Sequence, residues 1–317
     1  MSAESGQNPS QRREPMAAPV ITTRGLTKRY GSLTALNNLS LEVQDGEIFG
    51  CLGLNGAGKT TAIRLLLDLL RPTSGRALVF GYDCCTDGLK VRERIGYLPG
   101  ELGWYLDLTG LETLDFLAGL NQGRPTDRRY REELCERLEM PRADLRRRLR
   151  EYSAGMKRKL GIIQAFQARP PLLILDEPTD GLDPLMQEAV YALLADVKRE
   201  GATVFMSSHV LSEVERVCDR IGLLRKGELV LLSSVRESRR LAPRRVRVLF
   251  SEDVTVELEL PPGHELVERA PRLWRLAVAG PLGPLLALLE GLPVKDMEVD
   301  EARLEEVVLK YYREEDR

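Results

Sequence analysis

Eight residues, 53–60, constrain this chain more than any other stretch. Their sequence, Gly-Leu-Asn-Gly-Ala-Gly-Lys-Thr, follows an apolar run at 48–53 and precedes a helical pattern at 62–70. In such a strand–loop–helix turn, glycines let backbone N–H groups surround a phosphate, and the helix N-terminus adds the positive end of a dipole. An ordinary glycine-rich turn is the alternative, which this context disfavours. We therefore expect an α/β fold that binds a nucleotide at this loop.

Each polar residue of the loop has an expected role. The Lys59 ammonium is placed to neutralise the β- and γ-phosphates, and the Thr60 hydroxyl is placed to bind Mg²⁺. Thr61 is one residue further on, where it can reach the α-phosphate. The loop residues expected to cradle the phosphates are Gly53, Asn55, Gly56 and Gly58. The predicted ligands are ATP and Mg²⁺.

A second element is an apolar run, 172–175, that ends in Asp176, Glu177 and Pro178. Two acids at a buried strand end repel each other without a cation. A magnesium ion held partly by Asp176 supplies one, and it leaves Glu177 free to polarise a water aimed at the γ-phosphate. A strand that merely ends in an acidic turn explains this pattern alone, but not its occurrence together with the loop.

The rest of the chain predicts an α/β core with a second, smaller domain. Apolar runs at 172–175 and 203–206, with a helix at 185–200 between them, are typical of parallel strands covered on both faces. Charged, leucine-punctuated spacing predicts a helical subdomain at about 105–168. Residues 1–19 are expected to form a disordered arm, 20–235 the main domain, and 236–317 an accessory α+β domain.

Within the accessory domain, we expect strands at 246–250, 254–260 and 273–278, a helix at 282–289, and a final helix from Asp300 to about Tyr312. Leu304, Val307, Val308 and Tyr311 form one apolar stripe on that last helix. The arginines around Pro243 indicate a solvated linker, with a contact to acidic lipid or to a partner as the alternative.

Composition excludes several classes of function. Lys plus Arg number 46 against 48 Asp plus Glu, so the net charge of −2 gives no field to hold a nucleic acid, and no nucleic-acid partner is expected. Two separate histidines exclude a multi-histidine metal centre. Five scattered cysteines favour reduced thiols.

No stretch approaches the roughly 20 apolar residues of a membrane helix, and the first 20 residues lack the apolar core of a secretory signal.

With these elements in order, residues 20 to about 235 resemble the nucleotide-binding subunits of ABC transporters. The segment 152–157, Tyr-Ser-Ala-Gly-Met-Lys, resembles their signature, and 181–183, Gly-Leu-Asp, resembles their D-loop. His209 resembles the switch histidine that reaches the γ-phosphate. Tyr30 matches the aromatic residue that stacks on adenine, although a half-buried strand aromatic is the alternative. The resemblance implies a P-loop ABC cassette, with a RecA-like core, an antiparallel β subdomain and a helical subdomain.

The resemblance also implies a dimer. In this family the signature serine, here Ser153, and the backbone of Ala154 and Gly155 face the nucleotide on the partner subunit. Asp183 of the D-loop is a further residue expected to bind the nucleotide. Two ATP molecules are then held between two head-to-tail chains, and hydrolysis releases them. An integral membrane permease is the other implied partner, which places the chain at the cytoplasmic face of the membrane.

Two positions depart from the family pattern. The glutamine that normally touches Mg²⁺ and the attacking water is replaced by Gly100, followed by Glu101. Either Glu101 takes over as a metal ligand or a water does. Ala154 replaces the first glycine of the signature, a small change that a backbone without positive φ tolerates.

A single phosphate loop, Lys157-Arg158-Lys159 after the signature and Gly-Leu-Asp-Pro at 181–184 resemble the drug, antibiotic and multidrug exporter branch. A soluble ABC-type switch acting on a ribosome, on DNA or on a cofactor-assembly complex is the alternative. Translation factors of that kind carry two phosphate loops, and repair ATPases carry a long coiled coil, and this chain has neither. Nothing in the sequence identifies the cargo.

Lys59→Ala is expected to remove most ATP binding and turnover, because it deletes the cation on the β- and γ-phosphate oxygens. Equilibrium binding of a fluorescent ATP analogue and steady-state phosphate release measure both quantities. Wild-type activity in this variant would contradict the assignment of the loop.

Overall fold

The computed structural model describes residues 18–120, 126–241, 243–255, 259–300 and 308. Its centre is a six-stranded sheet in the order β10-β9-β3-β8-β7-β6, in which β10 is antiparallel to β9 and the other neighbours are parallel. The strands are β3 (Ile48–Leu52), β6 (Ile95–Leu98), β7 (Leu172–Asp176), β8 (Thr203–Ser208), β9 (Arg220–Arg225) and β10 (Glu228–Ser234).

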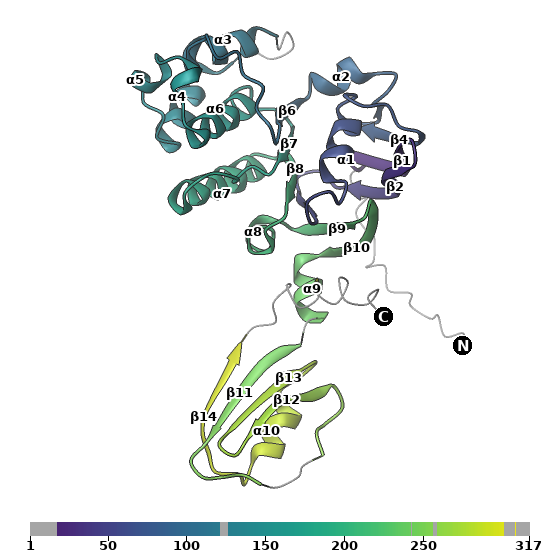
Figure 1. The fold of residues 1–317 in the computed structure, drawn as a ribbon, viewed down its shortest axis with the longest axis vertical. Coiled ribbons are helices and arrows are strands. Elements are labelled where there is room, and N and C mark those ends of the chain that lie inside the picture. Colours follow the sequence, from purple (N-terminus) through teal and green to yellow (C-terminus); the bar gives the residue numbers. More distant parts are fainter. Residues whose placement is uncertain (1–17, 121–125, 242, 256–258, 301–307, 309–317) are drawn as a thin grey trace, which may run out of the picture.

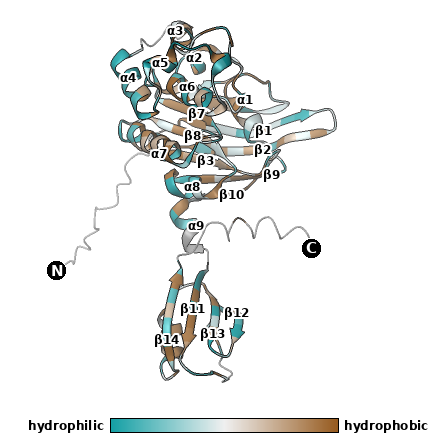
Figure 2. Cartoon of the chain, turned by 60° about the vertical axis from the view of Figure 1, so that its left-hand side comes forward, coloured by the Kyte–Doolittle hydropathy of each residue, from teal (hydrophilic) through white to brown (hydrophobic). Residues whose placement is uncertain are grey.

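Successive apolar side chains along the central strands point to opposite faces of this sheet, which explains why both faces are covered. In β7, Leu172 and Ile174 belong to one hydrophobic cluster, whereas Leu173 and Leu175 belong to the other. Continuous apolar strands of this kind are stable only between two layers. In Figure 2 the strands of the central sheet are mainly brown, whereas teal dominates the outer helices α4 (Arg128–Arg137) and α8 (Leu211–Val217).

An antiparallel sheet in the order β2-β1-β4-β5 packs on one side of the core together with α1 (Lys59–Leu66). Its strands are β1 (Ile21–Tyr30), β2 (Leu33–Val43), β4 (Ser74–Val79) and β5 (Tyr82–Asp83), and α2 (Gly88–Arg92) follows β5. The stacked rings of Phe49 and Phe205, 5.6 Å apart, lie in the shared cluster. The helix predicted at 62–70 is wrong in its bounds, because Asp68 has a positive φ of 56° that ends the helical path.

A group of helices lies beside the core, at the upper left of Figure 1. They are α3 (Gly110–Leu120), α4, α5 (Arg142–Leu145), the 3₁₀ turn η1 (Leu149–Glu151) and α6 (Ala154–Phe166). Their buried faces join the same cluster as one face of the central sheet. On that side, α7 (Pro184–Arg199) connects β7 to β8, and α8 connects β8 to β9.

A third sheet, in the order β12-β13-β11-β14, lies at the far end of the long axis in Figure 1, beyond α9 (Val235–Leu241). Its strands are β11 (Arg244–Phe250), β12 (His264–Ala270), β13 (Leu273–Val278) and β14 (Val294–Asp300), and α10 (Gly283–Leu289) covers one face. Phe250 and Trp274 pack edge to face in its core, with ring centroids 5.0 Å apart. This domain therefore has a hydrophobic cluster of its own.

Two expectations for this domain are wrong. Residues 254–255 and 259–260 of the predicted strand 254–260 are not in a strand, and Pro261 and Pro262, just before β12, lack the N–H groups that strand pairing needs. Asp300 does not begin a helix: it ends β14 and pairs with Arg245 of β11. The predicted arm 1–19 falls on described residues only at 18–19, and of the predicted final helix after Asp300 only Val308 is described.

Val308 lies in the core of the cassette rather than in that of the third sheet. It is helical and 7% exposed, and its cluster includes Val235 of α9 and Ile221 of β9. The chain thus leaves the central sheet through α9, forms the third sheet, and returns to the first body at Val308.

Val308→Asp is expected to lower the free energy of unfolding of the cassette by about 2–4 kcal/mol, because it buries an unpaired charge. Urea unfolding, followed by far-ultraviolet circular dichroism of the backbone, measures the change in this free energy. The matched control is Val267→Asp on β12, where the side chain is 67% exposed. Equal small effects in the two variants would show that Val308 does not support the core.

Candidate functional site

The loop between β3 and α1 has backbone conformations that require glycine. Gly58 has a φ of 107°, and a Cβ there would lie 2.7 Å from the Ala35 carbonyl oxygen. At Gly53 a Cβ would lie 2.5 Å from the Leu224 carbonyl oxygen. The loop is therefore packed against β2 and β9, and a side chain at either position would displace it.

Lys59 opens α1 and is almost fully buried at 6% exposure. Its ammonium donates to the carbonyls of Gly53, at 2.6 Å, and Leu54, at 3.3 Å. The Glu177 carboxylate lies on its other side, with Nζ and Oε1 3.2 Å apart. The ammonium thus lies between the carbonyls of the loop and the residue that follows β7.

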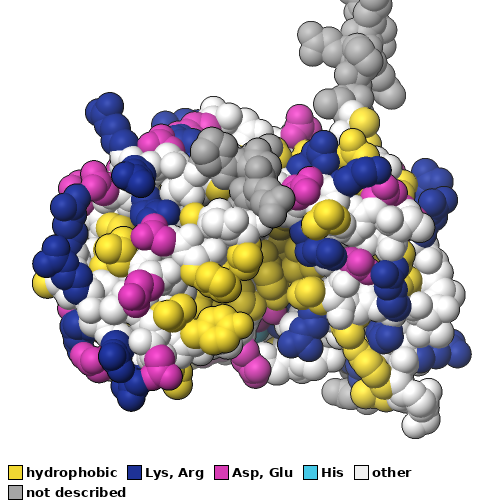
Figure 3. Space-filling view, turned by 90° about the horizontal axis from the view of Figure 1, so that it is seen from above, with side chains coloured by type: hydrophobic (Ala, Val, Ile, Leu, Met, Phe, Trp, Pro, Cys, Tyr) yellow, Lys and Arg dark blue, Asp and Glu magenta, His cyan; other side chains and the backbone are white. Residues whose placement is uncertain are grey.

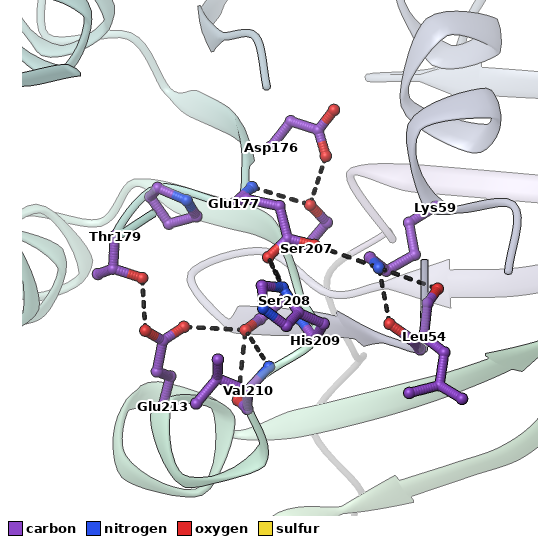
Figure 4. Close-up of polar contacts among 12 residues, drawn as sticks. Leu54, Lys59, Asp176, Glu177, Thr179, Ser207, Ser208, His209, Val210 and Glu213 are labelled. Carbon is purple, nitrogen blue, oxygen red and sulfur yellow. Dashed lines mark hydrogen bonds and ion pairs between the residues drawn. The ribbon is translucent and has the colours of Figure 1, made fainter. Parts of the chain in front are cut away.

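Asp176 ends β7 and is 1% exposed, yet both of its carboxylate oxygens have hydrogen-bond partners. The Thr60 hydroxyl donates to Oδ2 at 2.9 Å, and the Ser207 hydroxyl lies 2.5 Å from Oδ1. A buried carboxylate without such partners costs several kcal/mol. Figure 4 shows the contact between Asp176 and Ser207. Together with the Thr60 contact, it fixes the start of α1, the end of β7 and the end of β8 against one another.

Glu177 lies between a lysine and a histidine, as Figure 4 shows. Its Oε1 faces Lys59, and its Oε2 lies 2.8 Å from Nδ1 of His209 and accepts from the His209 backbone N–H at 3.2 Å. Glu177 is 20% and His209 43% exposed, so both side chains are open to solvent. An ordered carboxylate beside an ammonium and an imidazole is suited to proton transfer.

A buried network behind this pair centres on Glu213 of α8. Its Oε1 accepts from the Thr179 hydroxyl at 2.6 Å, and its Oε2 accepts from the Ser208 hydroxyl at 2.8 Å. Burial and the adjoining Glu213 carboxylate raise the pKa of the Tyr191 hydroxyl, which hydrogen-bonds to it from α7. The turn after β7 is therefore tied to the loop that carries His209.

Other residues of the predicted site lie on helix starts away from the loop. Ser153 caps α6, with its Oγ accepting from the Met156 N–H at 3.2 Å, and Asp183 caps α7 in the same way. A Cβ at Gly155 would lie 3.3 Å from the Gly181 carbonyl oxygen, so the two helix starts are neighbours. Among the described residues, no hydrogen bond joins any of them to the loop 53–61.

Tyr30 lies at the tip of the hairpin formed by β1 and β2, where it pairs with Leu33. Its ring is 47% exposed, with the Lys28 ammonium 5.1 Å from the ring centroid. The same hairpin reaches the phosphate loop, since Ala35 adjoins Gly58. The ring is thus available to a planar ligand, and adenine stacking stays a prediction.

Gly100, not Glu101, adjoins the buried carboxylate. A Cβ at Gly100 would lie 3.1 Å from Oδ2 of Asp176. Glu101 is exposed, and in the described part of the chain it makes no hydrogen bond or ion pair with Asp176 or Thr60. A role for Glu101 as a metal ligand is unsupported by these contacts and stays a prediction.

The donor set fits Mg²⁺. Thr60 and Asp176 present a hydroxyl and a carboxylate, and protein-bound Mg²⁺ takes one or two carboxylates together with phosphate oxygens and water. Over the described ranges, no three His, Cys, Asp or Glu side chains form a ready-made metal cluster. A cation bound largely through phosphate and water is consistent with both observations.

Sequence reasoning did not identify Ser207, Ser208, Thr179 and Glu213. A signal was present: two serines end an otherwise apolar strand, and both are fully buried. Polar residues at such positions must find partners, which here are Asp176 and Glu213. The identity of those partners depends on tertiary packing.

Comparison with known proteins identifies relatives of this chain. The family profile described as ABC transporter matches residues 36–180. The bacitracin transport ATP-binding protein BcrA of Enterococcus faecalis is 41% identical over 212 residues, 67% of this chain and 68% of that protein. An uncharacterized ABC transporter ATP-binding protein of Bacillus subtilis, YcbN, is 31% identical over 92% of this chain and 96% of its own length. A solved ATP-binding subunit of an ABC transporter aligns with a TM-score of 0.64 and 30% identity, over 70% of this chain and 92% of that one.

Glu177→Gln is expected to keep nucleotide affinity and to lower turnover by roughly 10²–10⁴, the usual effect of removing a general base. Binding and single-turnover hydrolysis separate the two quantities. The matched control is Glu188→Gln, which removes an exposed carboxylate paired with Arg216 on the surface. Turnover near the wild-type value in Glu177→Gln would exclude Glu177 as the base.

Proposed function

Because this chain belongs to the ABC transporter ATP-binding proteins, which hydrolyse ATP, we propose that it powers the export of an antibiotic, drug or lipid-like compound through a membrane permease. The observation that carries the cargo class is the 41% identity to a bacitracin transport ATP-binding protein over 212 residues. The geometry supports the energy source, since the phosphate loop, Asp176, Glu177 and His209 converge on one edge of the sheet.

In the proposed reaction, the loop amides and Lys59 bind the β- and γ-phosphates of ATP. Thr60 and Asp176 hold Mg²⁺, which supplies charge neutralisation on the phosphates. The Glu177 carboxylate accepts a proton from the attacking water, and His209 orients that carboxylate through the contact at Nδ1. Tyr30 stacks on the adenine.

We propose that two chains form the complete site. Ser153 and the backbone of Gly155 present a helix N-terminus to solvent, a position that favours anions. In a head-to-tail dimer this helix start meets the γ-phosphate held by the loop of the partner, with Asp183 beside it. The exposure of Ser153, Tyr30 and His209 supports an interface of this kind.

The permease is proposed to dock on an apolar surface patch formed by Tyr105, Leu106, Phe116 and Leu120. Tyr105 is 68% exposed and packs edge to face on Phe116 of α3, with centroids 6.0 Å apart. Seen from above, hydrophobic side chains gather near the middle of this face, beside a hollow (Figure 3). A patch of exposed aromatic side chains is typical of a protein interface. No described helix is long and apolar enough to cross a membrane. We propose that the permease holds the chain at the cytoplasmic face of the membrane.

Phe116→Asp is expected to leave the ATPase activity of the isolated chain unchanged. It is expected to abolish co-purification of the chain with the permease, because a charge replaces an apolar contact. Co-purification of the two expressed subunits measures assembly. Leu286→Asp, on α10 and 48% exposed, is the control substitution. Normal assembly of Phe116→Asp would place the docking surface elsewhere.

The export function is tested in cells that lack the chain. Sensitivity to peptide antibiotics of the bacitracin type is expected to rise, and the wild-type chain restores resistance whereas Glu177→Gln does not. Unchanged sensitivity to antibiotics, drugs and membrane-active lipids would contradict the proposed class of cargo.

A further inference from the structure

The edge of the central sheet at which the phosphate loop, Asp176 and Glu177 meet is called the catalytic edge here. Arg158 of α6 lies buried behind it, with 4% of its surface exposed. Within the described residues, every hydrogen bond of its guanidinium goes to a backbone carbonyl. Nη1 donates to Pro99 at 2.8 Å and to Gly100 at 3.2 Å, Nη2 donates to Asp176 and Glu177, and Nε donates to Pro178 at 3.4 Å. Arg158 therefore connects the signature helix to the chain after β6 and to the chain after β7.

A buried guanidinium is costly unless its donors are satisfied. Burial lowers the pKa of Arg158, while Asp180, Asp176 and Glu177 favour its charged form. Arginine stays protonated in proteins and presents its N–H groups in a rigid planar fork. A fork directed at both strand ends fixes the distance between them, which a lysine or an apolar side chain would not do.

The backbone of Glu177 needs this support. Its φ of 52° lies in the left-handed region, which a residue other than glycine adopts at a cost of about 1–3 kcal/mol. The Glu177 N–H donates to the Ser207 hydroxyl at 3.0 Å, and its carbonyl accepts from Arg158. The two contacts hold the turn that directs the carboxylate to Lys59 and His209.

We propose that Arg158 is a positioning residue that sets the backbone of Glu177 and links its carboxylate to movements of α6. This inference rests on the proposed ATP hydrolysis at Glu177. Because Gly100 has no side chain, the link between the helical subdomain and the catalytic edge runs through the Arg158 guanidinium and the backbone carbonyl of Gly100. A change in the position of Ser153 at the start of α6 then reaches Glu177 through one rigid group.

The test uses Arg158→Met and Arg158→Lys in the full chain, each alone and combined with Glu177→Gln. We expect kcat to fall by about 10²-fold in the single variants, as for a misplaced catalytic group, with little change in the dissociation constant of ATP. In the Glu177→Gln background, either substitution causes no further loss of kcat, because Arg158 acts through Glu177. The control is Lys159→Met, the next residue on α6, which removes a 4.0 Å ion pair with Glu139.

Three results would overturn the inference: a kcat near the wild-type value in both variants, a parallel loss of ATP binding, or an additive loss in the double variants. If Arg158→Met does not fold, Arg158→Lys carries the test, because its ammonium keeps the charge but cannot donate to both strand ends. A wild-type chain without ATPase activity would instead refute the proposed function, so the two failures are distinguishable.

Discussion

Two adjacent carboxylates at the end of one buried strand set the requirements that the rest of the structure meets. Asp176 is buried, whereas Glu177 is partly open to solvent. A buried carboxylate without hydrogen-bond donors or a cation costs several kcal/mol in folding free energy, and it favours its protonated form. Hydroxyls from α1 and β8, the ammonium of the phosphate loop and the imidazole after β8 supply these groups, and Arg158 holds the connecting backbone. Segments far apart in the sequence therefore converge here.

The sequence contained enough information to predict this edge of the sheet. The loop at 53–60 and the acids after 172–175 each follow an apolar strand, and parallel strands place their carboxyl ends together. The register agrees, since Leu52 pairs with Ser208 and Asp176 pairs with Ser207. Lys59, Asp176, Glu177 and His209 are consequently close in space, as the motifs indicated.

Other features depended on packing that no local pattern specifies. β12 carries charged residues on an edge strand with little burial, so its sequence lacks the alternation that marks a strand. The helix expected from 62 to 70 ends at Leu66, because the backbone at Asp68 turns into the left-handed region. Glu213 and Arg158 look like ordinary charged helix residues until the strand ends they contact are known.

The C-terminal domain is connected to the cassette in two places. α9 leads the chain out to a sheet with its own hydrophobic core, and Val308 returns to the cluster that contains Val235. A short domain held at both ends is restricted in where it can move.

The central claim is that one chain supplies the phosphate loop and another supplies the signature helix. Mixing two inactive variants, Lys59→Ala and Ser153→Arg, tests it most directly. In a head-to-tail dimer, each mixed pair contains one site in which both parts are intact, so equal mixing restores about a quarter of the wild-type ATPase rate. A mixture as inactive as its two components would contradict the shared site and place the whole reaction within a single chain.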